Sequence, residues 1–214
     1  MKKIYILVLM VAMMPLFGNA QTIELTENQK KEMEVRIKQK LETFLDYLAY
    51  VASKDKEVQD DAIKSTLALF IGKGYPYEMP DLYGVMTRYE GVKMQTASIR
   101  KNRKGSYYKV VKDPELLRDY LQRLKGMPYS RVTIEQVGAI RVDNIYKTGD
   151  GRYQATAHFC QDFAGYRDGK IAYHDRTTKS IKIYINLIDV DGSPEGQTWQ
   201  VLLGDMKVES ISRN

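Results

Sequence analysis

Residues 153–187 read YQATAHFCQDFAGYRDGKIAYHDRTTKSIKIYINL, and this stretch carries the clearest secondary-structure pattern in the chain. Two long runs, Tyr153–Phe163 and Ile171–Val190, flank a reversal at Gly165–Gly169. In the second run the apolar residues alternate with polar ones and so share one face of a strand: Ile181, Ile183, Ile185 and Leu187. The pattern predicts two long antiparallel strands joined by a tight turn.

Further strands are expected on both sides of this hairpin. Val132 and Ile134 begin a strand, a second strand region spans Ile140–Ile145, and a last strand runs from Trp199 to Ile211. Turn signals separate them at 148–151 and 191–196. The second half of the chain is therefore predicted to be an antiparallel sheet.

Helices are expected before the strands. Thr26 and Gln29 form a capping-box pattern, and apolar residues then recur at the helix period up to Val51. A second helix is predicted from Glu57 to Ile71, and a third is predicted to open at Asp113-Pro114 and to end at Gly126.

The segment between the second and third helices is harder to assign. Residues 75–81 are predicted to be an irregular loop. Two strands, Val92–Ile99 and Ser106–Val111, are expected to flank the basic stretch Arg100–Gly105. Helices followed by consecutive strands indicate an α+β domain in which helices cover one face of an antiparallel sheet.

The N-terminus has the pattern of a secretory signal peptide. Two lysines, Lys2 and Lys3, precede an uncharged apolar run that ends at Leu16, and small residues stand at Gly18 and Ala20. Cleavage after Ala20 would leave residues 21–214 as a single domain in the periplasm or outside the cell. The apolar run is short for a membrane span, and no later stretch is long and apolar enough for one.

The order of elements resembles the NTF2-like (cystatin-like) α+β fold. The stretches Phe159–Gly169 and Tyr173–Lys179 are similar to those of exported NTF2-like proteins of the Bacteroidetes type. This resemblance implies N-terminal helices packed on a curved antiparallel sheet, which together form a cone that can hold a pocket. It implies no catalytic residue, because the fold serves enzymes and binding proteins alike.

Three potential metal-ligand or catalytic side chains alternate along one predicted strand. His158, Cys160 and Asp162 therefore point to the same face, opposite Phe159 and Phe163. Same-face neighbours on a strand are nearly 7 Å apart, which disfavours a metal site. His158 with Asp162 as general base and orienting carboxylate is the alternative, weighed against a partly exposed strand histidine.

Tyrosine is abundant, with 16 residues, and several tyrosines are candidates for contacts with a ligand or partner. The candidates lie in the 75–89 loop and on the strands: Tyr75, Tyr77, Tyr83, Tyr89, Tyr166, Tyr173 and Trp199. The loop tyrosines can equally cover the open end of the sheet.

The charge pattern and the absent motifs narrow the function. The net charge of +6 is modest, and the segment Arg100–Lys104 is either a solvated hairpin tip or a site for anionic glycan or lipid headgroups. Signatures of nucleotide, zincin and serine-hydrolase chemistry are missing from the sequence. We expect an exported cell-envelope binding or scaffolding protein without catalytic activity. Its partner would be an envelope protein or a small molecule, with a homodimer through the open sheet face as a further possibility. No cofactor, metal or nucleic-acid partner is expected. The alternative is a small-molecule enzyme or ligand carrier that uses a cone-shaped pocket with His158 and Asp162.

Overall fold

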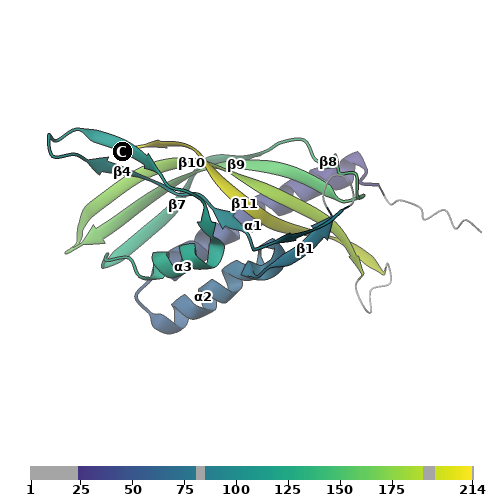
Figure 1. Cartoon of the computed structure of the whole chain (residues 1–214), viewed down its shortest axis with the longest axis horizontal. Coiled ribbons are helices and arrows are strands. Elements are labelled where there is room, and N and C mark those ends of the chain that lie inside the picture. The colour runs from purple at the N-terminus through teal and green to yellow at the C-terminus, as the bar shows by residue number, and fades with distance from the viewer. Residues whose placement is uncertain (1–23, 81–84, 190–195, 214) are drawn as a thin grey trace, which may run out of the picture.

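The computed structural model describes residues 24–80, 85–189 and 196–213. The predicted signal peptide and the turn predicted at 191–196, apart from Gly196, lie outside these residues. Within them the chain is an α+β structure in which helices pack on a curved, mostly antiparallel sheet (Figure 1). None of the described helices combines the length and apolar character that a membrane span requires.

The helices follow the apolar period of the sequence. Helix α1 spans Glu27–Val51, and its predicted capping box is present, with the Oγ1 of Thr26 accepting a hydrogen bond from the Gln29 N–H. The apolar residues on one face of this helix are buried: Met33, Ile37, Leu41, Phe44, Leu45, Leu48 and Val51. Helix α2 spans Lys56–Ala68 and helix α3 spans Leu117–Lys125, both in contact with α1.

The described part of the chain contains one seven-stranded sheet, with β8 paired at the side of β9 and the other strands in the order β6-β3-β11-β10-β9-β7. Its long members are β7 (Arg131–Val142), β9 (Tyr153–Arg167), β10 (Lys170–Asp189) and β11 (Gln197–Ser212). The short members are β3 (Lys93–Met94), β6 (Glu115–Leu116) and β8 (Tyr146–Lys147). The pairing register shifts within β7–β9, β9–β10 and β10–β11, and such interruptions of the ladder bend a sheet.

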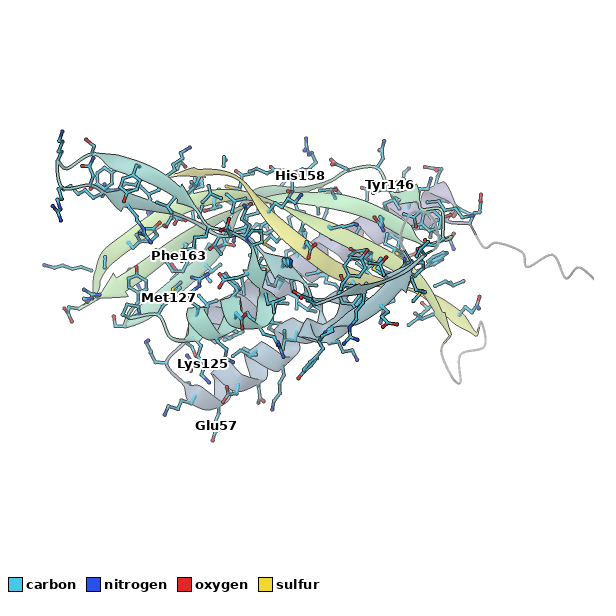
Figure 2. All side chains as sticks on the ribbon, in the orientation of Figure 1. Glu57, Lys125, Met127, Tyr146, His158 and Phe163 are labelled. Atoms are coloured by element: carbon cyan, nitrogen blue, oxygen red, sulfur yellow. The ribbon has the colours of Figure 1, made fainter. Side chains whose placement is uncertain are left out.

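The two faces of the sheet differ in character. Odd-numbered residues of β9 and β10 face the helices, so Ala157, Phe159, Ile181 and Ile183 are buried in the main core. Even-numbered residues lie on the other side, which we call the outer face. Between 156 and 162 in β9 and between 174 and 182 in β10 these residues are polar and partly exposed. In Figure 2 His158 and Phe163 mark these two sides.

The irregular loop predicted at 75–81 is wrong. Residues 77–80 are not an irregular loop but strand β1 (Tyr77–Pro80), which pairs with β2 (Met86–Tyr89) and stacks the rings of Tyr77 and Tyr89 at 5.1 Å. The prolines at 76 and 80 indicate a loop, whereas the cross-strand aromatic pair with β2, the next strand along the chain, stabilises a hairpin.

The third helix begins at Leu117 and not at Asp113-Pro114, where the sequence pattern predicted its start. Glu115 and Leu116 first pair with β3 as strand β6, and the N–H of Leu117 donates to the carbonyl of Val92 at 2.9 Å. The neighbouring backbone therefore satisfies the helix start, and no side chain caps it.

A separate hairpin carries the basic segment. The predicted strand Val92–Ile99 is divided into β3 and β4 (Ala97–Lys101), and β4 pairs with β5 (Tyr107–Val111). The Oδ1 of Asn102 accepts hydrogen bonds from the backbone of Lys104 and Ser106 and so closes the turn. The β4–β5 hairpin projects at one end of the molecule, close to the C-terminus (Figure 1).

Candidate functional site

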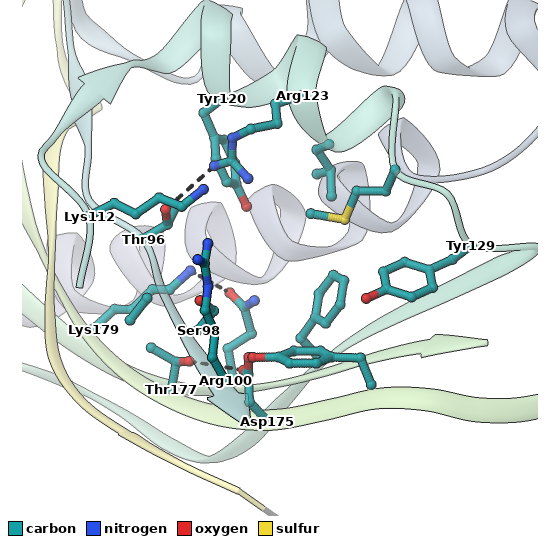
Figure 3. A pocket seen from close by; sticks show the side chains of 16 residues that line it. Thr96, Ser98, Arg100, Lys112, Tyr120, Arg123, Tyr129, Asp175, Thr177 and Lys179 are labelled. Carbon is teal, nitrogen blue, oxygen red and sulfur yellow. Dashed lines mark hydrogen bonds between the residues drawn. The ribbon is translucent and has the colours of Figure 1, made fainter. Parts of the chain in front are cut away.

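A pocket of about 200 Å³ lies between helix α3, the base of the β4–β5 hairpin and the concave face of strands β9 and β10 (Figure 3). Its polar lining residues are Thr96, Ser98, Arg100, Lys112, Arg123, Gln161, Asp175, Thr177 and Lys179. Tyrosines and apolar residues complete the wall: Ala97, Tyr120, Leu124, Met127, Tyr129, Phe163 and Tyr173. The volume is smaller than the 300–1,000 Å³ that is usual for drug-sized ligands, so the pocket fits a small molecule.

Strand β10 contributes a polar stripe to the pocket. Asp175 is 5% exposed, and its carboxylate accepts hydrogen bonds from the Tyr173 hydroxyl at 2.5 Å and the Thr177 hydroxyl at 3.1 Å. The Tyr173 oxygen in turn accepts a hydrogen bond from the Ile99 N–H at 2.9 Å, which fixes the hairpin to the sheet. Burial raises the pKa of Asp175 against the opposing effect of these hydrogen bonds.

Lys179 continues this stripe and is a buried amine. Lys179 is 5% exposed. Within the described part of the chain its Nζ donates one hydrogen bond, to the Oε1 of Gln161 at 3.1 Å. An ammonium group can donate three hydrogen bonds, so the group has spare donors in this environment. Burial lowers the pKa of Lys179 to about 8, although the charge of Asp175 acts in the opposite direction.

The pocket lining has an excess of positive charge. Arg123 is paired with Glu115, whereas Arg100, Lys112 and Lys179 form no ion pair with any residue that the structure describes. Asp175 is the only carboxylate among the lining residues of this described pocket. Such an arrangement attracts an anion.

A polar group near the hairpin also lacks a partner. The Oγ of Ser98 is buried and has no hydrogen-bond partner within the described segments. Buried hydroxyl groups are normally hydrogen-bonded, and an unsatisfied one next to a cavity is a candidate contact for a ligand.

The other side of the pocket is aromatic and apolar. The ring of Phe163 packs edge-on against Tyr129 and Tyr173, with centroid distances of 6.2 and 6.0 Å. Tyr129 lies directly over Gly165, where a Cβ would stand 2.6 Å from the ring. Figure 3 shows Tyr129 on the opposite side of the pocket from Lys112 and Lys179, so the charged and apolar surfaces are separated.

The predicted pair His158 and Asp162 lies on the outer face and does not line this pocket. The ring nitrogens of His158 lie 2.6 Å from Glu209 Oε1 and 3.0 Å from Asp143 Oδ2. Arg176 binds Asp162 with two hydrogen bonds, of 2.6 and 2.8 Å, and lowers the pKa of that carboxyl.

Cys160 is a free, half-buried thiol between these residues on the outer face. In the described part of the chain, no three His, Cys, Asp or Glu side chains gather in a way that could hold a metal ion.

Of the predicted tyrosine and tryptophan contacts, Tyr173 lines the pocket. Tyr77 and Tyr89 stack on each other in the β1–β2 hairpin, while Tyr75 is exposed beneath the guanidinium of Arg118. Tyr166 lies under Arg131, and Trp199 packs on Tyr153 away from the pocket. Tyr83 lies outside the described residues.

Sequence reasoning missed Lys179, Asp175 and Thr177 as site residues. The signal was present, because the alternation of Ile181, Ile183 and Ile185 places residues 179, 177 and 175 on the same buried face when it is continued backwards. Charged residues on a core-facing stripe are a marker of a polar cavity.

The chain was also compared with known proteins. No family model, no curated protein and no solved structure matches it. The geometry of the pocket therefore carries the functional argument.

Proposed function

We propose that the chain is an exported, non-catalytic binding protein of NTF2-like fold whose pocket takes a small molecule with one anionic group and an apolar body. The observation that carries this proposal is the buried Lys179 together with Arg100 and Lys112, which form no ion pair with the described residues. A carboxylate or similar anion at this side would use the free donors of Lys179.

The apolar part of the ligand would pack on the aromatic side of the pocket, against Tyr129 and Phe163. The pocket combines a polar, charged side with an aromatic and apolar side, and small-molecule sites use such polar groups to orient a ligand whose body packs on apolar side chains. The alternative of an enzyme based on His158 and Asp162 is not favoured, because neither residue lines the pocket.

The NTF2-like assignment is part of the proposal and is supported by the helices that pack on one face of a curved, mostly antiparallel sheet. Export rests on the signal-peptide pattern of residues 1–20. A homodimer through the outer face, an envelope protein as partner and the absence of a nucleic-acid partner stay predictions.

Calorimetric titration of residues 21–214 tests the function. Benzoate and hexanoate are the probes, and the neutral benzamide and hexanamide are their matched controls. We expect binding of the carboxylates alone, loss of this binding in Lys179→Met, and normal binding in Lys170→Met, which removes an exposed lysine from the same strand. Equal binding of the amides, or equal losses in both variants, would contradict the proposal.

A further inference from the structure

The β4–β5 hairpin is strongly basic over its whole length. Residues 97–112 contain six lysines and arginines and no Asp or Glu: Arg100, Lys101, Arg103, Lys104, Lys109 and Lys112. All six are exposed. The remainder of the chain mixes both signs of charge, so this hairpin concentrates positive potential at one end of the molecule (Figure 1).

Exposed aromatic and apolar side chains accompany these charges. Tyr107 and Tyr108 are 49% and 48% exposed, and Val111 is 53% exposed. Because Lys101 pairs with Tyr107 and Arg100 pairs with Tyr108 across the hairpin, each of its two faces carries a cation beside a tyrosine. A single flat partner surface would use only one of these faces.

The C-terminal segment adds to the same patch. The guanidinium of Arg213 lies 3.9 Å from the centroid of the Tyr107 ring, and the Lys101 Nζ lies 5.7 Å from that centroid. Tyrosine rings flanked by cations are the combination that favours the headgroup region of a bilayer, where the ring is half-buried and the charge meets phosphate.

We propose that the β4–β5 hairpin docks tip-first on the surface of a bilayer that contains anionic lipids. The cations contact lipid phosphates, and the tyrosines of both hairpin faces enter the headgroup region. The pocket lies at the base of the same hairpin, so docking by the tip turns the end of the molecule that carries the pocket toward the membrane. The proposal does not depend on the identity of the pocket ligand.

Vesicle sedimentation of residues 21–214 tests the docking. We expect binding to vesicles of phosphatidylcholine with 30% phosphatidylglycerol, weak binding to pure phosphatidylcholine, and a decrease as salt is added. Removal of two tip charges in Arg103→Gln/Lys104→Gln should weaken partitioning about 30-fold, at about 1 kcal/mol per charge near the surface. Tyr107→Ser/Tyr108→Ser should weaken it as well.

The matched control is Lys31→Gln/Lys64→Gln, which removes two exposed charges from helices α1 and α2. It should retain partitioning, and the tip variants should keep the carboxylate binding of the pocket. Equal losses in both charge variants would overturn the proposal. So would heparin binding as tight as vesicle binding with no effect of the tyrosine changes, which would indicate a general polyanion site.

Discussion

The Nζ of Lys179 lies 3.1 Å from the Oε1 of Gln161, and this hydrogen bond joins strands β10 and β9 on the concave face of the sheet. Both side chains are buried, at 5% exposure each. A neutral amide satisfies one donor of the amine but does not compensate its charge. The position therefore costs folding free energy in the empty protein.

Lys179→Met should stabilise the protein at neutral pH for this reason. The pKa of Lys179 is lowered from 10.5 to about 8 by burial, so below pH 8 the folded state carries the full cost of the buried charge. Between pH 8 and 10.5 the folded amine is neutral while the unfolded amine is still protonated, so the wild type gains stability as the pH rises.

The test is chemical unfolding of both proteins at pH 7 and pH 10. The stability advantage of Lys179→Met should shrink by about 2 kcal/mol between these values. Comparison of the two proteins at each pH cancels the titration of the tyrosines. An advantage that stays constant with pH would show that Lys179 is not a buried charge.

Ser98→Ala examines the unsatisfied hydroxyl at the pocket. Because the Oγ of Ser98 has no partner among the described residues, its removal should leave the stability of the empty protein unchanged or slightly raised. Affinity for a pocket ligand should fall about 5-fold if the ligand supplies the missing hydrogen bond. Titration of benzoate into both proteins measures this, and unchanged affinity would exclude Ser98 as a ligand contact.

Gly165→Ala tests how the aromatic side of the pocket is built. A Cβ at Gly165 would stand 2.6 Å from the ring of Tyr129, so the ring has to move. The cost should be about 1–3 kcal/mol of stability. In a Tyr129→Ala background the same change should cost far less, and a double-mutant cycle of unfolding free energies gives the coupling. Additive effects would mean that the ring does not pack on Gly165 in solution.

The sequence predicted the architecture better than the site, and the reason is local periodicity. The capping box at Thr26 and the alternation from Ile181 to Leu187 are local signals, and the structure confirms the elements that they define. The β1–β2 hairpin and the late start of α3 depend on pairing between two strands, of Tyr77 with Tyr89 in one case and of Leu116 with Lys93 in the other. Local patterns carry no information about such pairs.

The site was harder to predict because His158 and Asp162 were selected by residue type, whereas the face of the strand on which a residue lies determines whether it can line the pocket. His158 and Asp162 are typical catalytic residue types, yet they alternate with Phe159, which lies in the core, and Phe163, which packs against it. The phase of the apolar residues therefore assigns His158 to the outer face. The same phase assigns Lys179 and Asp175 to the face that packs against the helices, where both side chains are buried and line the pocket.

His158→Gln separates the outer face from the pocket. His158 lies between two carboxylates, those of Asp143 and Glu209, and an imidazole donates to both only when it is protonated. Because both carboxylates are partly exposed, loss of the interaction should cost about 1 kcal/mol of stability. Carboxylate binding in the pocket should be unchanged, since His158 lies on the other side of the sheet.

Thermal unfolding and benzoate titration should change in opposite ways in His158→Gln and Lys179→Met if the ligand binds in the pocket. The first variant should lose stability and keep binding, and the second should gain stability and lose binding. The opposite pattern, with binding lost in His158→Gln while the fold survives, would return the functional site to the outer face. The expected opposite changes would instead assign ligand recognition to the buried polar stripe of β10. There the charge of Lys179 destabilises the empty protein, and an anionic ligand neutralises that same charge.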